Sequence, residues 1–297
     1  MAQKDLKNRI GSVKNIQKIT RAMEMVAAAR LRRAEQRIEH LRPYAGAIRR
    51  MTRQAASAAE NIPSLPILQE HEQVNRVGLL FVTGDRGLAG AFNSQILRAG
   101  LRAAAEHESA GRTTVPFASG RRGVSSLTFR GLELGGTYIG FTDRPAYANA
   151  REIAEDLMSA YVDGQLDQVE IFYNGYVSPL TQEVRRETLL PLQRATILEA
   201  PEEDGDEDTG HHALVEYEPD PEQILHRLVP DYVEISVFRA LLESTASEHG
   251  ARMTAMRNAS DNAGELIESL TLQMNRARQA EITQEIMEVV AGAEALG

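Results

Sequence analysis

The last sixty or so residues of the chain, from about Asp231 to Ala295, carry the pattern that most restricts how it can fold. No proline follows Pro230, and apolar or small residues recur at alternating intervals of three and four. A heptad pattern of this kind is typical of a helix that lies along another helix. The residues of this seam are Met253, Met256, Ser260, Ala263, Ile267, Leu270, Met274 and Ala277.

The pattern changes over the final turns. In residues 277–293 the apolar positions are Ile282, Ile286, Val289 and Val290, and they do not continue the seam. They stand among small alanine and glycine residues. We therefore expect the middle of this helix to pack against another helix and its tip to occupy a different, separate socket.

Residues 1–60 predict a second very long helix. Pro43 lacks a donor for the carbonyl of Glu39, so we expect a bend or local break there. At about 1.5 Å per residue each terminal helix would span roughly 80–90 Å, and the two pair most simply in antiparallel fashion. The stripe loosens at Gln17 and Thr20, and its other members are Leu6, Ile10, Val13, Ala27, Leu31, Ala34, Ile38, Leu41, Ala45, Ile48, Thr52, Ala55 and Ala59.

The middle of the chain reads as an α/β domain. Residues 76–83, RVGLLFVT, form an unbroken apolar run, which is typical of a strand buried on both faces. A glycine-rich turn and a helix over residues 91–106 follow it, and residues 145–161 predict another helix. The alternation indicates a Rossmann-like parallel sheet. Further strands are expected at 113–118, 136–140, 168–173, 184–190 and 195–198.

Charge and composition narrow the possibilities. Residues 1–60 contain fourteen Lys or Arg against five Asp or Glu, although the whole chain has a net charge of −9. The basic segment predicts an acidic partner. Residues 201–222 carry ten acidic residues and no Lys or Arg, which predicts a solvated loop. The chain has no cysteine, no apolar run long enough for a bilayer and no signal-peptide pattern, so we expect a cytosolic protein.

Chemical motifs are few. The turn Gly84–Gly90 follows a strand and precedes a helix, where phosphates often bind, but it lacks a lysine and Asp85 would repel an anion. His211 and His212 fit no structural metal spacing. Tyr44 is the one aromatic residue in the basic helix, so base stacking is not expected. We predict no catalytic constellation, metal site, cofactor or nucleic-acid site.

Three strings nevertheless identify a family. IGSVKNIQKITRAMEMVAAARLRRAE (10–35), FVTGDRGLAGAFN (81–93) and ARQAEITQEIMEVVAGA (277–293) closely resemble the gamma subunit of the F-type ATP synthase, bacterial type, in order and spacing. YEPDP (217–221) and DNAGELI (261–267) extend the resemblance over essentially the whole chain. Gly84 stands where the family usually has serine, a change expected to matter little.

The resemblance implies a non-catalytic rotor. Its partners would be the alpha and beta subunits of a catalytic ring, the epsilon subunit and the c ring, with one copy per complex. It would lie peripherally at the cytoplasmic face of the bacterial plasma membrane without entering the bilayer. It would couple proton flow to ATP synthesis or hydrolysis by rotating.

The resemblance also assigns residues. Those matched to contacts with the alpha/beta ring are Met23, Arg252, Arg278, Gln279, Thr283 and Glu285. The bearing tip would be Ile282, Ile286, Val289 and Val290. Tyr217 and Glu218 match positions in the foot near the c ring.

The domains expected are a shaft helix over 1–60, an α/β foot over 61–205, and an acidic loop with the second shaft helix over 206–297. Two alternatives stand beside the rotor. A free-standing nucleotide-binding enzyme would bind ATP or a dinucleotide as an isolated chain. A coiled-coil nucleic-acid binder would show affinity for DNA that falls steeply with salt.

Overall fold

The structure, a computed structural model, describes residues 2–58, 65–179, 181–192 and 220–294. The expected domain boundaries at 60/61 and 205/206 fall outside these residues and stay predictions. Outside them also lie the predicted strand 195–198, His211 and His212, most of the acidic tract, and Tyr217 and Glu218.

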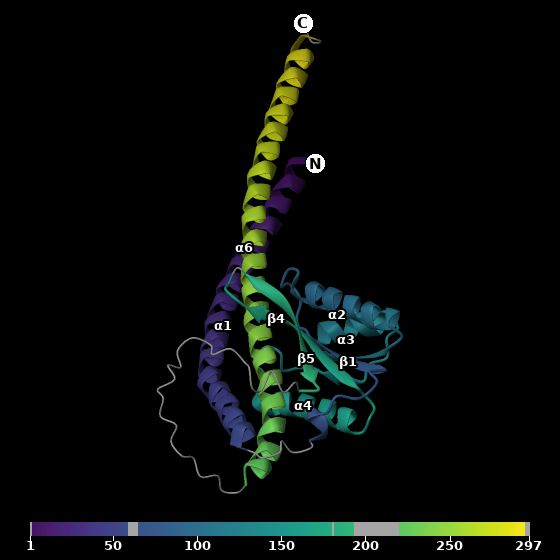
Figure 1. Cartoon of the computed structure of the whole chain (residues 1–297). Coiled ribbons are helices and arrows are strands. Elements are labelled where there is room, and N and C mark those ends of the chain that lie inside the picture. Colours follow the sequence, from purple (N-terminus) through teal and green to yellow (C-terminus); the bar gives the residue numbers. More distant parts are fainter. Residues whose placement is uncertain (1, 59–64, 180, 193–219, 295–297) are drawn as a thin grey trace. The chain divides into compact units, whose positions relative to one another are not determined.

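Two long helices contain the terminal parts of the chain (Figure 1). Helix α1 runs over Ala2–Ala58 and includes Pro43 without interruption, so no break occurs at that proline. Helix α6 runs over Pro221–Glu294. It begins ten residues before the expected start and contains Pro230, where an interior proline costs about 3 kcal/mol. The neighbouring side chains of Leu228, Val229 and Val233 are buried, and this packing offsets that cost.

The sequence stripes agree with the burial of both helices. Every described member of the seam in α6 is buried or half-buried, and so is every described member of the stripe in α1. The seam therefore does contact other parts of the chain, as the heptad pattern predicts.

A five-stranded sheet has the order β3-β2-β1-β4-β5. Strands β1, β2, β3 and β4 are parallel, whereas β5 pairs antiparallel with β4. The predicted Rossmann-like parallel sheet is confirmed for four strands, and β5 departs from it because the few residues between β4 and β5 are too short for a crossover. The strands are β1 Arg76–Val82, β2 Thr113–Ser119, β3 Gly136–Tyr138, β4 Gln168–Tyr176 and β5 Gln182–Leu190.

Helices cover both faces of the sheet. Val77, Leu79 and Phe81 of β1 pack in one core with helices α2 and α3. Leu80 and Val82 pack on the other face with α4 and α6. The unbroken apolar run in β1 thus serves two cores, as predicted. The helices are α2 Phe92–Ser109, α3 Arg121–Phe129 and α4 Tyr147–Val162, and a 3-10 turn, η1, covers Pro66–Leu68.

Helix α3 was not predicted. Its sequence, RRGVSSLTF, holds a glycine, two serines and a threonine, which are weak helix formers. The buried side chain of Leu127 and the contacts of its first turn with the sheet hold it in place. Tertiary packing here outweighs local propensity.

The chain divides into two compact units. One contains residues 2–29 and 252–294, and the other contains residues 30–251. We call the first the arm and the second the α/β unit. Each of the two long helices contributes residues to both.

Candidate functional site

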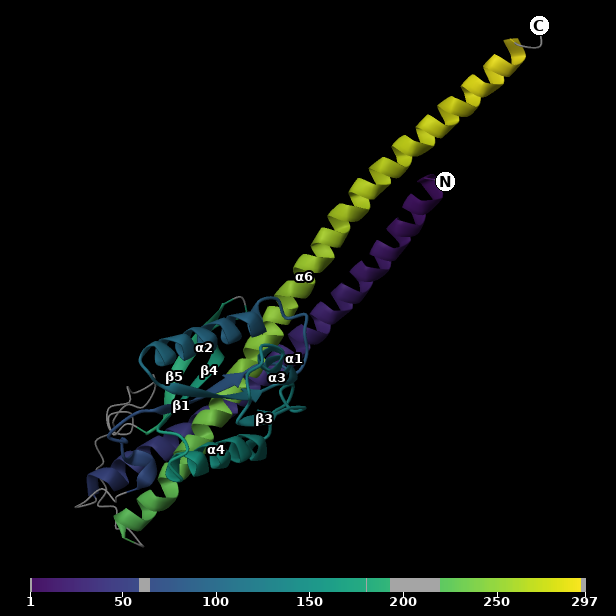
Figure 2. The ribbon, with the colours of Figure 1, turned by 90° about the vertical axis from the view of Figure 1, so that its right-hand side faces the viewer.

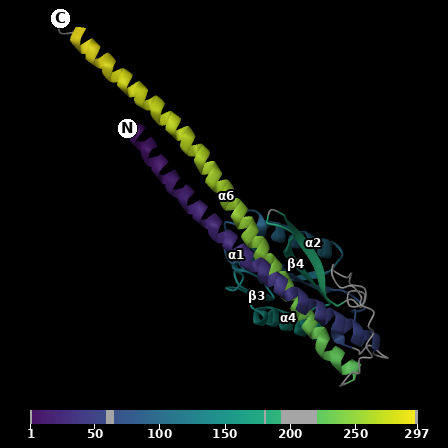
Figure 3. The same ribbon diagram turned by 90° about the vertical axis from the view of Figure 1, so that its left-hand side faces the viewer.

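The arm is an antiparallel pair of helices. Gln17 donates from Nε2 to the backbone carbonyl of Ser260 at 3.2 Å, and Arg257 donates from Nε to Glu24 at 2.9 Å. Partner numbers fall in α6 as they rise in α1, which is the antiparallel order. Figure 3 shows both chain ends at the same end of the arm.

The two polar residues that interrupt the stripe of α1 have partners. Thr20 is buried and donates its hydroxyl to the carbonyl of Gln17 at 3.0 Å, while Gln17 bonds across to α6. A polar residue in a coiled-coil seam fixes the register of the two helices at some cost in stability. The bond from Gln17 to α6 therefore helps to fix how the two helices of the arm are aligned, whereas the bond of Thr20 satisfies its hydroxyl within α1.

Apolar side chains also lie on the outside of the arm. Met25 is 63% exposed, and Val26, Ile16 and Ile19 on α1 are more than half exposed. They lie off the seam, so the helix pair does not cover them. Exposed apolar groups gathered in this way mark an interaction surface. In the sequence these side chains are visible as apolar residues outside the stripe of α1, but we did not predict an interaction surface from them.

The end of α6 is exposed on all sides. Figure 2 shows it projecting beyond the start of α1. All residues from 278 to 291 are exposed, including the predicted tip residues Ile282, Ile286, Val289 and Val290, with Val289 at 72%. Met287, which was not predicted, is exposed as well. The structure thus places the four tip residues together on an uncovered helix end.

The polar residues assigned by resemblance lie in different surroundings. Arg278, Gln279, Thr283 and Glu285 are exposed on the same helix end, and Thr283 donates its hydroxyl to the carbonyl of Gln279 at 2.8 Å. Met23 is half-buried beside the stripe of α1. Arg252 is 8% exposed. The structure therefore brings Arg278, Gln279, Thr283 and Glu285 together. Arg252 is buried and lies 26 residues before Arg278 in the same helix.

In the glycine-rich turn after β1, the carboxylate of Asp85 takes the position that a bound anion would need. The carboxylate of Asp85 accepts hydrogen bonds from the backbone N–H of Arg121 at 3.0 Å and of Gly140 at 2.9 Å. Arg121 is the first residue of α3, where a free N–H would otherwise attract an anion. Burial acts to raise the pKa of Asp85, but the hydrogen bonds from Gly140, Arg121 and Thr142 outweigh it and leave the pKa below its ordinary value.

Helix α6 covers the same edge of the sheet. Ser244, Thr245 and Ser247 are buried and donate to the carbonyls of Val82 at 3.3 Å, Thr142 at 2.9 Å and Asn174 at 3.0 Å. Ligands of doubly wound sheets bind beyond the carboxyl ends of the strands. In this chain that position is filled by helix α6, which argues against a nucleotide at this edge.

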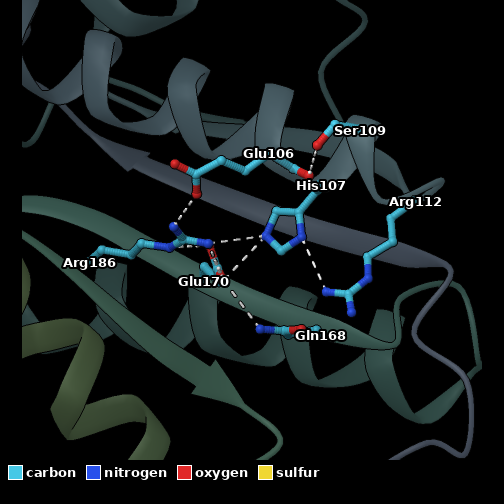
Figure 4. Close-up of polar contacts among 7 residues, drawn as sticks. All are labelled: Glu106, His107, Ser109, Arg112, Gln168, Glu170 and Arg186. Atoms are coloured by element: carbon cyan, nitrogen blue, oxygen red, sulfur yellow. Dashed lines mark hydrogen bonds and ion pairs between the residues drawn. The ribbon is translucent and has the colours of Figure 1, made fainter.

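An ionic cluster around the buried carboxylate of Glu170 links α2 to β4 and β5 (Figure 4). Arg186 donates to both oxygens of Glu170, at 2.9 and 3.0 Å, and to Glu106 at 2.8 Å. His107 lies 3.3 Å from Glu170, which is 4% exposed. These residues bond to one another around the buried carboxylate of Glu170, an arrangement that fastens α2 to the sheet. Because these residues lie far apart in the sequence, no sequence pattern predicted the cluster.

Two further observations concern the described residues as a group. None of their helices is both long enough and apolar enough to cross a bilayer. No cluster of three or more His, Cys, Asp or Glu suited to a metal ion is found among them.

A two-helix arm with exposed apolar residues and an α/β unit whose ligand edge is filled define a protein that combines a coiled coil with an α/β domain. The family model described as ATP synthase matches residues 2–296. ATP synthase gamma chains of Rubrobacter xylanophilus and Moorella thermoacetica are 46% and 43% identical to this chain. Each comparison covers 99% of this chain and 98% of the relative. The chain belongs to the ATP synthase gamma chain family.

Solved structures agree. The chain is similar to one from the central stalk and c ring of the Tetrahymena thermophila mitochondrial ATP synthase, with a TM-score of 0.60 and 27% identity over 82% of this chain and 99% of that one. A chain of the Euglena gracilis mitochondrial ATP synthase has a TM-score of 0.67 at 16% identity, covering 99% of this chain and 94% of that one. The second likeness supports the fold alone.

Proposed function

We propose that this chain is the central-stalk rotor subunit of an F-type ATP synthase. Its arm would turn inside a ring of alpha and beta subunits and couple transmembrane proton flow to ATP synthesis or hydrolysis there. The observation that carries the proposal is the arm itself. Its seam is buried, while its outer apolar side chains and all of residues 278–291 are exposed and available to a surrounding partner.

The mechanism follows from the unequal faces of the arm. Lys4, Lys7, Lys14, Lys18 and Arg21 are exposed on α1 and give part of its surface a positive charge. A turning shaft with unequal faces contacts three otherwise identical sites differently at each angle. Differential contact is what shifts a site between open and closed states. Proton flow supplies about 2.3 kcal/mol per charge per 100 mV.

The residue roles belong to the proposal as well. Arg278 and Gln279 would bind a loop of one catalytic beta subunit, and Met23 would act at the neck of the shaft. Arg252, Thr283 and Glu285 would couple the two shaft helices to each other or to the ring. Ile282, Ile286, Val289 and Val290 would form a smooth apolar bearing. Tyr217 and Glu218 would lie in the foot near the c ring, and epsilon would bind beside it. One copy per complex, peripheral at the cytoplasmic face of the bacterial membrane, completes the proposal.

Assembly is the direct test. The chain is coexpressed with the alpha and beta subunits of the same organism, and the complex is weighed by native mass spectrometry. We expect one copy of the chain with three alpha and three beta subunits. Nucleotide binding or substrate turnover by the isolated chain, with no assembly, would overturn the proposal in favour of an enzyme.

Point variants then test the helix end. We expect Arg278→Ala and Gln279→Ala to slow ATP synthesis by the assembled complex without changing the melting temperature of the free chain, because both side chains are exposed. Arg276→Ala is the matched control, since Arg276 is exposed on the same helix and has no assigned role. Equal synthesis rates in all three variants would remove the ring-binding role.

A further inference from the structure

The loop that follows β3 receives contacts from both long helices. Within the α/β unit, Thr245 of α6 donates its hydroxyl to the carbonyl of Thr142 at 2.9 Å. Arg37 of α1 donates from Nη2 to the carbonyl of Pro145. We call residues 142–145 the joint loop. Its short length means that two helices far apart in sequence bind the same few residues.

Asp143 lies at the centre of the joint loop. Arg30 of α1 contacts both carboxylate oxygens of Asp143, with Nη1 2.5 Å from Oδ1. His249 of α6 places Nε2 3.6 Å from the same Oδ1, and its side chain is only 2% exposed. One carboxylate therefore lies between a cation on the first helix and an imidazole on the second.

The joint loop is fastened in turn to the central strand. Thr142 donates from its backbone N–H and its hydroxyl to Asp85, at 3.2 and 3.0 Å. Asp85 donates its own N–H back to the hydroxyl of Thr142 at 2.9 Å. Because Asp85 comes three residues after the end of β1, the contacts run from the sheet through Asp85 and Thr142 to Asp143 and both helices.

The contacts of the joint loop differ from the apolar packing around them because hydrogen bonds have a preferred direction. Close-packed apolar side chains resist movement of a helix by interlocking, and hydrogen bonds add restraints with a defined direction. Charge-assisted hydrogen bonds are short and have a preferred geometry. The Arg30–Asp143 pair therefore restrains the part of α1 that lies in the α/β unit, and the hydrogen bond from Thr245 to the carbonyl of Thr142 restrains α6 there.

We propose that the joint loop passes twisting force between the α/β unit and both long helices, and that Asp143 is the positioning residue at its centre. This inference rests on the proposed rotor function. Both helices continue into the arm, and the joint loop holds the parts of both helices that lie in the α/β unit at a common point.

The test uses the assembled, membrane-reconstituted complex. Proton pumping per ATP hydrolysed is measured for the unaltered chain, Asp143→Ala, Asp143→Asn and Arg30→Gln. We expect Asp143→Ala and Arg30→Gln to lower this ratio and to widen the angular fluctuation of the stalk in single-molecule rotation. Asp143→Asn should lower it less, because a neutral hydrogen bond keeps about half the strength of a charge-assisted one.

Two controls separate force transmission from general loosening. Arg98→Ala changes an exposed residue of α2 in the same unit, and the ratio should not change. The double variant Arg30→Asp with Asp143→Arg keeps an ion pair with its charges exchanged. It should therefore recover the part of the pumping ratio that depends on the contact with α1. Arg30 is about one-third exposed, so its replacement is expected to leave the chain folded. Arg30→Gln therefore tests the joint loop even where Asp143→Ala fails to fold.

The outcomes are distinct. The first outcome is that the unaltered chain assembles and pumps, and that Arg30→Gln and the soluble Asp143 variants show the same pumping ratio and the same angular width. This result would disprove the proposed role of the joint loop and leave the proposed rotor function intact. If the complex with the unaltered chain assembles but shows no coupled pumping, the proposed function itself fails.

Discussion

Asp85 and Thr142 bond to each other in both directions: the N–H of Asp85 donates to the hydroxyl of Thr142 at 2.9 Å, and that hydroxyl donates to the carboxylate of Asp85 at 3.0 Å. The pair joins the loop after β1 to the loop after β3. It also fills the place at the start of α3 where a bound anion would otherwise be expected.

Removing this carboxylate should therefore cost stability. In Asp85→Ala the N–H groups of Arg121, Gly140 and Thr142 lose their acceptor, and hydrogen bonds to a charged group contribute about 1.5–3 kcal/mol each. Because water reaches this loop in part, we expect a total loss of about 2–4 kcal/mol in the free energy of unfolding, measured by urea titration at pH 7. A loss below the error of the titration would contradict this role.

The same group predicts a pH dependence. The pKa of Asp85 is lower in the folded chain than in the unfolded chain, so its stabilising contribution is complete above the unfolded pKa, about 3.9. It is lost as pH falls through the folded pKa. The difference in unfolding free energy between the unaltered chain and Asp85→Asn should thus shrink between pH 5 and the onset of acid unfolding. A constant difference over that range would show that the charge is unimportant.

The ion pair between the buried Glu170 and the partly exposed Arg186 gives a further prediction. Arg186→Met leaves the carboxylate of Glu170, which is 4% exposed, without this charged partner. Because the side chain of Arg186 is 40% exposed, water can replace part of the interaction, and we expect a loss of about 1–3 kcal/mol in the free energy of unfolding. The double variant with Glu170→Gln should recover much of the loss, because no buried charge remains. Arg98→Ala, an exposed position on α2, should change the unfolding free energy by no more than about 0.5 kcal/mol in the same melting experiment.

The seam and the tip of α6 should respond differently. Leu270→Ala removes a buried seam side chain and should lower the unfolding free energy of the arm by about 2 kcal/mol. Ile286→Ala should leave the free chain unchanged, since Ile286 is 57% exposed, yet reduce coupling in the assembled complex. The readouts are thermal melting of the free chain and ATP-driven proton pumping. A large stability loss in Ile286→Ala would mean that the tip packs within the chain.

Gly84 gives a prediction about the residue usual in the family. An added Cβ would lie 2.7 Å from the carboxyl group of Glu248, so any side chain forces Glu248 to move. Serine, unlike alanine, can donate a hydrogen bond to that carboxylate. We expect Gly84→Ser to be less destabilising than Gly84→Ala, by about 1 kcal/mol in urea titration. Equal losses would show that Glu248 moves out of reach.

Much of the fold was predictable because periodic patterns report which face of an element is buried. The stripe from Leu6 to Ala55 and the seam from Met253 to Ala277 gave the two helices, and the run at 76–82 gave a strand with a core on each side. Helix α3 was missed since its residues are weak helix formers, and the direction of β5 was missed since a strand pattern does not report its direction.

The sequence by itself determined the two long helices, the positions of the five strands that the structure describes and the family, because each is written in local period or in a contiguous string. Only the tertiary structure decided that Asp85 and α6 fill the ligand edge of the sheet, and that Asp143 meets both Arg30 and His249. Those contacts join residues more than a hundred positions apart in some cases. A hydrogen bond between distant residues depends on how the elements pack, which no local pattern encodes.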